Sequence, residues 1–312
     1  MMLKLKFINW WSNGKDDFFK KFIENYMNVE TVVVDHEPDI LFFSVFHKIS
    51  PHQYVKNNPS VKLKIFFTGE DTTSGYSRGC GSDHYYLNFA DISLGFKNLD
   101  HPNYIRFPLW LTYINIEKYN MGKPCLPFQK IVNFKPNNQG KFCCIISNHD
   151  SNNTRTNIVE SLSNHEIISV AGNIKNNFKN IAKIHNISAG KNEYNKQLCL
   201  NGFKFNICSE SSISPGYISE KLFECIIGGC IPIYYCNHDV DIESEIINNN
   251  FIIKYNNNNV ETVTKKILEI NNNKKLYDEF VNQNILNNNA YDNIISYYDK
   301  LKIKIFEKLN EF

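Results

Sequence analysis

Two charged side chains, Glu220 and Lys221, stand where a helical pattern begins, at the end of the stretch Pro215-Gly216-Tyr217-Ile218-Ser219-Glu220-Lys221. The macrodipole disfavours a cation in the first turn of a helix, so a bound anion would offset the charge of Lys221. Glu220 could accept hydrogen bonds from sugar hydroxyls, and Tyr217 could stack on a ring or donate a hydrogen bond. On spacing alone, an exposed Glu-Lys pair on a surface helix is the competing interpretation.

Glu70 and Arg155 are further candidates for chemistry. Glu70 follows an apolar strand pattern and a glycine, in Thr68-Gly69-Glu70-Asp71, and a carboxylate at such a strand end suits a catalytic base. Arg155 stands just before a helical pattern and could bind a phosphate bidentately. Taken alone, Glu70 would belong to a solvated turn and Arg155 would be ordinary surface charge.

Two tryptophans close the first strand pattern, in Asn9-Trp10-Trp11. Parallel α/β sheets usually place ligands at the carboxyl ends of their strands. The tryptophans could therefore stack on the face of a sugar. Packing in the hydrophobic core is the alternative interpretation, and the sequence leaves both open.

Asp239 and Asp241 form an Asp-x-Asp pattern, which in some glycosyltransferases holds a divalent metal through its carboxylate oxygens. The pattern follows a strand, in a loop outside the other motifs, so we interpret it as loop sequence. The chain shows no His and Cys spacing typical of zinc. We therefore expect no obligatory metal.

The elements that would position these residues alternate between strand and helix patterns. Apolar residues at 222, 223, 226 and 227 lie on one helical face, Gly228-Gly229 ends the helix, and a short buried strand follows. Such loop, helix and strand units are typical of α/β folds. The predicted strands cover Leu3–Trp11, Thr31–Val34, Ile40–Val45, Lys62–Phe67, Ala90–Phe96, Tyr104–Trp110, Lys141–Asn148, Ile167–Gly172, Phe203–Cys208 and Cys230–Tyr235. Further helical patterns cover Asp17–Met27, a segment capped by Asn157, two helices within Val260–Phe280, and Tyr291–Phe312.

The length of 312 residues suffices for two α/β domains. Residues 120–140 are rich in Pro, Gly, Asn and Lys, and this composition predicts a linker. We therefore expect domains over residues 1–130 and 131–312. The polar, glycine-containing residues 72–84 predict a mobile loop.

Composition narrows the class of protein. The net charge is only +2, which makes no case for nucleic-acid binding. No run of 18 apolar residues predicts a membrane span, and the N-terminus lacks the pattern of a signal peptide. Nine scattered cysteines without paired motifs indicate reduced, mostly buried thiols. A cytoplasmic protein is the resulting expectation.

The last helical pattern, residues 291–312, combines an apolar stripe with four lysines, Lys300, Lys302, Lys304 and Lys308. Such a helix could lie on a membrane surface as a peripheral contact. More often it packs back on the protein across the domain junction, and we favour this interpretation.

The motif around Lys221 resembles the donor-binding motif of the α-1,3-fucosyltransferases. Gly216–Lys221, followed by Ile231-Pro232-Ile233-Tyr234-Tyr235, is similar to the family pattern Tyr-Val-Thr-Glu-Lys, a helix, then Pro, Ile or Val, and an aromatic. Bacterial members are also similar at Asn9-Trp10-Trp11, at Phe67-Thr68-Gly69-Glu70, and from Asp91 through Arg106-Phe107-Pro108-Leu109. The matching segments occur in the family's order, and they extend over nearly the whole chain.

The resemblance implies the GT-B architecture, in which two Rossmann-like domains face each other across a cleft. It implies transfer of L-fucose from GDP-fucose to a glycan hydroxyl with inversion, as an α-1,3 linkage to an N-acetylglucosamine-type sugar. Residues 1–130 would then bind the acceptor, and residues 131–312 would bind GDP-fucose. Such a reaction belongs to glycan biosynthesis or protein glycosylation.

The resemblance also implies roles for single residues. Glu70 would be the general base, while Arg155 and Lys221 would bind the diphosphate without metal. Glu220 and Tyr217 would bind the ribose or the fucose and support positive charge near the anomeric carbon, so that Glu220 would be a catalytic residue beside Glu70. Two positions depart from the family pattern, because its asparagine aligns with Ser211, which could keep one ribose contact, and its glycine aligns with Cys236.

Two rival functions remain at this stage. The first is a glycan- or nucleotide-binding protein without catalysis on the same fold, because a fold does not fix a function. A base and two phosphate ligands in their expected motifs argue against it. The second is a metal-dependent transferase of another nucleotide sugar that uses Asp239 and Asp241.

Overall fold

The structure is a computed structural model of the chain, and it describes all residues except 1, 13, 15–16, 47, 72–84, 121–125, 151–152, 180, 190–192, 212–213, 237–240 and 312. Contacts between residues divide the chain into two compact units. Unit 1 comprises Met1–Phe128, Ser214–Ser219 and Tyr291–Phe312, and unit 2 comprises Gln129–Ile213 and Glu220–Ala290. The loop predicted over residues 72–84 lies outside the described residues.

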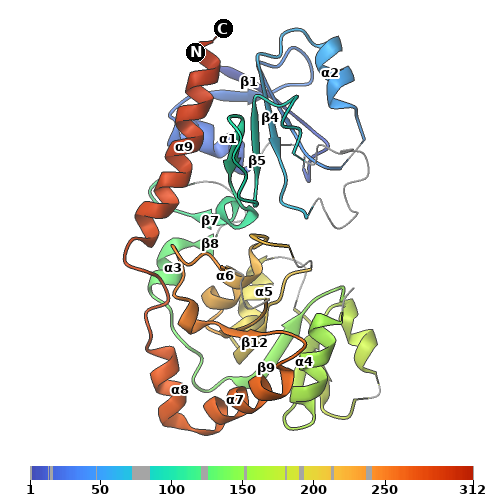
Figure 1. Cartoon of the computed structure of the whole chain (residues 1–312), viewed down its shortest axis with the longest axis vertical. Coiled ribbons are helices and arrows are strands. Elements are labelled where there is room, and N and C mark those ends of the chain that lie inside the picture. Colours follow the sequence, from blue (N-terminus) through green and yellow to red (C-terminus); the bar gives the residue numbers. More distant parts are fainter. Residues whose placement is uncertain are drawn as a thin grey trace. The chain divides into compact units, whose positions relative to one another are not determined.

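Unit 1 is built on a six-stranded sheet whose neighbouring strands all run parallel, in the order β2-β1-β3-β4-β5-β6 (Figure 1). Every residue of β3 and β5 is buried, as expected for a parallel sheet covered on both faces. The strands are β1 (Leu3–Ile8), β2 (Thr31–Val33), β3 (Ile40–Phe43), β4 (Leu63–Phe67), β5 (Ile92–Gly95) and β6 (Tyr104–Arg106), and a separate parallel pair joins β7 (Ile114–Asn115) to β8 (Leu126–Pro127).

Five strands of unit 1 end earlier than the sequence patterns predict, and β1 and β6 differ the most. β1 stops at Ile8, because Asn9 adopts a left-handed backbone conformation with φ +52°. β6 stops at Arg106, two residues before Pro108, and a 3-10 turn over Leu109–Thr112 follows. The polar and aromatic residues that follow the strands therefore lie in loops at the edge of the sheet.

The helices of unit 1 include one that the sequence patterns missed. α1 (Phe18–Lys21) begins at Asp17, whose carboxylate accepts a hydrogen bond from the Phe19 N–H at 2.9 Å. It continues as a π-helical turn over Phe22–Tyr26, and together they confirm the helix predicted for this part of the chain. The missed helix, α2 (Pro51–Asn57), follows β3.

The long helix α9 (Ala290–Asn310) packs within unit 1, where it lies alongside α1 (Figure 1). Four residues of its apolar stripe are at most 1% exposed, namely Ile294, Tyr298, Leu301 and Ile305, whereas Ile295 and Leu309 are partly exposed. This burial confirms that the stripe packs on protein. The predicted grouping of residues 291–312 with the C-terminal domain is corrected, because the stripe finds its aromatic partners in unit 1. Among the described residues, no helix combines the length and the apolar character that a membrane span requires.

Unit 2 holds a second six-stranded parallel sheet, in the order β11-β10-β9-β12-β13-β14 (Figure 1). Counted along the chain, this is the 3-2-1-4-5-6 order of the Rossmann fold. The strands are β9 (Lys141–Ile146), β10 (Ile168–Ala171), β11 (Ile184–Asn186), β12 (Phe203–Ile207), β13 (Ile231–Tyr235) and β14 (Ile253–Tyr255).

The helices of unit 2 surround that sheet. They are α3 (Phe128–Val132, the first residue of which belongs to unit 1), α4 (Thr154–Ser163), α5 (Glu193–Leu200), α6 (Lys221–Ile227), α7 (Val260–Asn272) and α8 (Lys274–Val281), with 3-10 turns at Asn173–Phe178 and Asn249–Phe251. Residues 120–140, predicted as a linker, contain α3 because Phe128 and Ile131 are buried. α7 and α8 confirm the two helices predicted within Val260–Phe280.

The cysteines that the structure describes all lie in unit 2 and are unpaired. Of these seven, only Cys199 is not buried. Burial raises the pKa of the Cys143 and Cys144 thiols well above the ordinary value, so these thiols are inert. The prediction of reduced, mostly buried thiols is confirmed for these residues.

Each sheet has one topological switch point, at which later strands of the chain are added on the opposite side of the first strand. In unit 1 the point lies between β1 and β3, because β2 lies on one side of β1 and the later strands lie on the other. In unit 2 it lies between β9 and β12. Parallel α/β sheets bind ligands at the carboxyl ends of the strands beside such a point.

Candidate active site

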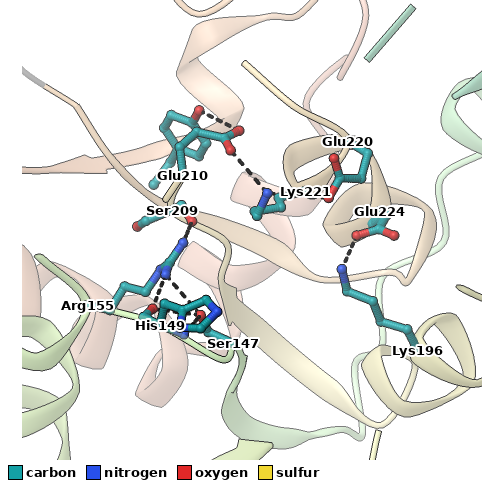
Figure 2. Close-up of polar contacts among 10 residues, drawn as sticks. Ser147, His149, Arg155, Lys196, Ser209, Glu210, Glu220, Lys221 and Glu224 are labelled. Atoms are coloured by element: carbon teal, nitrogen blue, oxygen red, sulfur yellow. Dashed lines mark hydrogen bonds and ion pairs between the residues drawn. The ribbon is translucent and has the colours of Figure 1, made fainter. Parts of the chain in front are cut away.

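Arg155 and Lys221 both contact the loop that follows β12, beside the switch point of unit 2. The Arg155 guanidinium donates through Nη2 to the carbonyl oxygen of Ser209 at 2.7 Å. The Lys221 ammonium group lies 3.4 Å from Oε2 of the next residue, Glu210. In Figure 2, Arg155 points to Ser209 and Lys221 points to Glu210. The structure therefore brings the two predicted phosphate ligands to one loop.

Arg155 is a buried side chain that joins two loops. It is 4% exposed, and its Nη1 donates to Oγ of Ser147, at 2.9 Å, and to the carbonyl oxygen of His149. These residues follow β9, whereas Ser209 follows β12. The guanidinium thus connects the loops on both sides of the switch point. Its Nε–H and one Nη2 hydrogen remain without a partner among the described residues.

Asp150 fixes the start of α4 and with it the position of Arg155. Its carboxylate accepts hydrogen bonds from the Arg155 N–H at 3.2 Å and from the Thr156 N–H at 2.7 Å. The predicted capping residue, Asn157, is corrected: it lies inside the helix, and its side chain contacts Asn257 instead. Asp150 was missed because it stands four residues before the first helical residue.

Lys221 lies between two carboxylates. Besides Glu210, its ammonium group contacts Oε1 of Glu220 at 3.3 Å. Its side chain is 28% exposed, so it can still reach a ligand from solvent. Glu210 is buried and its other oxygen accepts a hydrogen bond from the Tyr234 hydroxyl at 3.1 Å.

The charges of this cluster follow from these contacts. Burial acts to raise the pKa of Glu220, but the charges of Lys221 and Lys196 outweigh it and lower the pKa below its ordinary value. Burial, followed by the charge of Glu210, raises the pKa of Tyr234 well above its ordinary value. At neutral pH, Glu220 is therefore ionised, and Tyr234 is a neutral donor.

A third cation, Lys196 on α5, forms an ion pair with Glu224 on α6 (Figure 2). Glu224 is 3% exposed, and burial raises its pKa although Lys196 opposes the shift. The sequence patterns did not point to Lys196, Glu210 or Glu224. The position of Glu224 beside Glu220 could have been predicted, because residues four apart are neighbours on the surface of a helix. The position of Lys196 could not, since it comes from a separate helix.

Two further predicted donor-binding residues are Ser211 and Tyr217. Ser211 is exposed. Tyr217 belongs to unit 1, where its ring packs 5.0 Å from the ring of Phe96. Gly216, at φ +78°, precedes it, and a Cβ there would approach the Phe96 carbonyl oxygen to 2.7 Å. The glycine therefore permits the close packing of this short segment in unit 1.

The predicted base, Glu70, follows β4 in unit 1. Its backbone N–H donates to the Thr68 hydroxyl at 3.1 Å, and that hydroxyl donates to its carbonyl oxygen at 2.8 Å. Its side chain is partly exposed, and within the described residues its carboxylate has no partner. The next carboxylate, Asp71, is 4% exposed and accepts a hydrogen bond from Ser214 at 2.5 Å. Of the two, Glu70 has the carboxylate that a substrate can reach.

The Asp-x-Asp pattern is only partly described. Asp239 lies outside the described residues, and Asp241 accepts a hydrogen bond from the Ser244 N–H at 2.9 Å. In the part of the chain that the structure describes, no group of three His, Cys, Asp or Glu side chains is arranged to hold a metal ion.

Two family models match the chain. Residues 135–286 match "Glycosyltransferase family 10 (fucosyltransferase) C-term", and residues 5–113 match "Alpha-(1,3)-fucosyltransferase FucT N-terminal domain". The chain belongs to the family 10 fucosyltransferases. The N-terminal match lies within unit 1 and the C-terminal match covers most of unit 2, so each six-stranded sheet falls in one half of the family's sequence.

A curated relative of this family 10 chain is the alpha-(1,3)-fucosyltransferase FucT of Helicobacter pylori, which is 22% identical over 338 residues. The match covers 97% of the chain but only 64% of the relative. The chain thus spans less than two thirds of the length of FucT.

Solved structures with the same fold include two of alpha1,3-fucosyltransferase. One has a TM-score of 0.61 at 17% identity, and another, with GDP-fucose, has a TM-score of 0.59 at 18% identity; both matches cover 96% of this chain and 90% of the other. An alpha-glucosyltransferase in complex with UDP and DNA has a TM-score of 0.58 at 11% identity, over 96% of this chain and 100% of the other. These likenesses confirm the predicted α/β class and GT-B type of this family 10 chain.

Proposed function

We propose that this family 10 chain transfers L-fucose from GDP-fucose to a hydroxyl of a glycan, with inversion at the anomeric carbon. Family membership supports the sugar and the class of reaction. A solved structure of the same fold holds GDP-fucose, which supports the donor. The observation that carries the proposal is the partly exposed Lys221 ammonium group beside the switch point of a Rossmann-ordered sheet.

Lys221 and Arg155 bind the donor diphosphate in this proposal. An arriving diphosphate replaces the Lys221 contacts with Glu210 and Glu220, which lie at the long distances of 3.4 and 3.3 Å. Arg155 offers its remaining N–H groups while it holds the two loops together. α6 has only seven residues, so the charge of Lys221 rather than a helix dipole supplies the attraction. Glu220, Ser211 and Tyr217 are the proposed ligands for the sugars of the donor.

Glu70 is the proposed general base. It takes the proton of the acceptor hydroxyl as that oxygen bonds to the anomeric carbon and the bond from this carbon to the GDP oxygen breaks. The negative charge of the leaving GDP is stabilised by Lys221 and Arg155, so no divalent metal is required. A base of this kind typically contributes about 10²–10⁴ in rate.

The acceptor is an N-acetylglucosamine-type sugar, and the linkage is α-1,3, in the same proposal. The name of the H. pylori relative supports this linkage. We also propose that the protein acts in the cytoplasm in glycan biosynthesis or protein glycosylation.

Lys221→Ala tests the donor site. Removing a charged partner from a phosphate costs about 1.5–3 kcal/mol, so the affinity for GDP should fall roughly 10- to 100-fold in calorimetry. Lys274→Ala is the matched control, because that lysine is 87% exposed in the same unit and should leave the affinity unchanged. An unchanged GDP affinity in folded Lys221→Ala would contradict the assignment. Arg155→Ala is a poorer test, since it also breaks bonds between loops and should lower the stability.

A further inference from the structure

Exposed apolar side chains gather at the switch point of the sheet in unit 1. Trp11 follows β1 and is 43% exposed, whereas Phe46 and Ile49 follow β3 and are 38% and 45% exposed. The rings of Trp11 and Phe46 lie 5.0 Å apart at an interplanar angle of 83°. Aromatic rings of this size are seldom left in water without a reason when they form a patch.

The structure distinguishes the two adjacent tryptophans. Trp10 packs edge-on against Phe7 and Phe19, and its Nε1–H donates to Asp17 at 2.6 Å. Its ring therefore packs against the core. Trp11 contacts the rings of Trp10 and Phe67, but it is 43% exposed, so much of its ring remains accessible. Packing against the core therefore describes Trp10, whereas stacking on a sugar stays a prediction for Trp11.

Asn9 fixes the geometry of this patch. Its side-chain oxygen accepts hydrogen bonds from the N–H groups of Lys48 and Ile49 at 2.8 and 2.9 Å, and its Nδ2 donates to the Ile49 carbonyl at 2.8 Å. The side chain is 5% exposed. These three bonds tie the loop after β1, which carries Trp11, to the loop after β3, which carries Phe46.

The patch lies at the same sheet edge as the proposed base. The Trp11 ring is 5.8 Å from the ring of Phe67, the last residue of β4, and Glu70 follows three residues later. β1, β3 and β4 are neighbours in a parallel sheet, so their carboxyl ends share one edge. A ligand on Trp11 would therefore lie at the edge where Glu70 can act.

We propose that Trp11 and Phe46 bind a pyranose ring of the acceptor glycan, and this inference rests on the proposed function. One face of a pyranose ring carries mainly C–H groups, whose slight positive charge suits the negative face of an aromatic ring. The hydroxyl rim of the sugar stays free for polar contacts. The occupant is an N-acetylglucosamine-containing acceptor rather than the donor, whose proposed phosphate ligands belong to unit 2.

The test compares Trp11→Ala with Trp11→Phe in transfer from GDP-fucose to N-acetyllactosamine. Trp11→Ala should raise the KM for N-acetyllactosamine at least about tenfold, equivalent to about 1.4 kcal/mol, whereas Trp11→Phe should restore most of the affinity. The KM for GDP-fucose and the GDP affinity by calorimetry should stay unchanged. Leu99→Ala, which alters another partly exposed apolar residue of unit 1, should change none of these quantities.

Direct binding separates this inference from the proposed function. Saturation-transfer NMR should detect N-acetyllactosamine on the wild type and lose the signal in Trp11→Ala. An acceptor KM unchanged in Trp11→Ala, or no N-acetyllactosamine signal on the wild type, would overturn the inference even where GDP still binds. A shift from dimer to monomer in Trp11→Ala with the acceptor KM unchanged would also overturn it and assign the patch to contact between copies. Loss of GDP binding in the wild type would instead contradict the proposed function.

Discussion

At the scale of single residues, the lysines of the candidate site are already paired with carboxylates. Lys221 contacts Glu210 and Glu220, and the buried Glu224 pairs with Lys196. When no donor is bound, these ion pairs compensate the charges of the site. An unpaired buried charge would lower the stability of the fold. In the proposed donor site, the diphosphate would compete with these carboxylates for Lys221.

Glu70→Gln keeps the shape of the side chain and removes its basicity. We expect transfer to fall about 10²–10⁴-fold while the affinity for GDP-fucose stays unchanged, because the group acts on the acceptor proton. Initial rates and calorimetry measure the two quantities. Asp71→Asn is not a matched control, since Asp71 holds Ser214. A near wild-type rate in Glu70→Gln would exclude Glu70 as the base.

Asp17 makes the stability depend on pH. Burial raises its pKa from 3.8 to about 6, although hydrogen bonds from Trp10 and Phe19 oppose the shift. The folded state therefore holds the proton more tightly than the unfolded state, and stability is lost as the pH rises from about 4 to about 6. Relative to Asp17→Asn, the unfolding free energy of the wild type should fall by about 3 kcal/mol across this window. Urea unfolding at several pH values measures it, and a difference that does not change with pH would contradict the shift.

At the scale of elements, α9 supplies part of the core of unit 1. Tyr298 is fully buried among Phe18, Phe22 and Phe107, and its hydroxyl donates to the Leu111 carbonyl. The lysines of the helix are partly engaged: Lys304 and Lys308 form ion pairs on the helix itself or just beyond it. These contacts explain why this basic helix packs its apolar face on unit 1.

Tyr298→Ala should lower the unfolding free energy by roughly 3–5 kcal/mol, because it leaves a large cavity and unpaired carbonyls. Tyr298→Phe should cost only about 1 kcal/mol, the value of a hydrogen bond. Ile303→Ala is the control, since Ile303 is 56% exposed on the same helix and should change stability by less than about 0.5 kcal/mol. Urea unfolding measures all three. Equal stabilities of Tyr298→Ala and Ile303→Ala would contradict this role of α9.

Removal of residues 291–312 tests the remaining proposal of a peripheral membrane contact. We expect the shortened chain to be poorly soluble with a lower Tm, because the core of unit 1 loses Ile294, Leu301 and Ile305. A soluble chain with normal Tm that no longer sediments with anionic liposomes would favour the membrane instead.

Periodicity predicts most strands and the long helices, because buried parallel strands are short apolar runs and α7 and α9 have clear helical faces. Periodicity does not predict where an element ends, and it does not predict a helix that lacks an apolar face. Asn9 ends β1 by a left-handed conformation, and α2 has mainly polar residues, so neither follows from apolar spacing. The grouping of α9 with unit 1 depends on contacts far apart in the chain.

The candidate site was predictable where its residues lie within one motif, as with Glu220 and Lys221. It was not predictable where partners come from other elements. Glu210 pairs with Lys221, although residues 214–219 between them belong to unit 1. Lys196, the partner of Glu224, lies on a separate helix, α5. No single-sequence pattern joins such residues.

At the scale of the whole molecule, the chain contains two parallel sheets, each with its own switch point. The proposed donor ligands cluster at one, and the exposed aromatic residues with Glu70 lie along the edge of the other. A separate ligand-binding edge on each sheet would suit a transfer reaction, which has two substrates. The chain matches only 64% of its H. pylori relative. Fucose transfer therefore has to be tested on these two units themselves.

The most direct test of the central claim is transfer from GDP-fucose to N-acetyllactosamine in excess EDTA, followed by mass spectrometry. We predict a product heavier by one fucose residue with an α-1,3 linkage. Lys221→Ala should form less of it, and Glu70→Gln should form almost none. Release of GDP should depend on the acceptor. The account is contradicted if no fucosylated product forms while GDP-fucose stays intact, or if product forms only when a divalent metal is added.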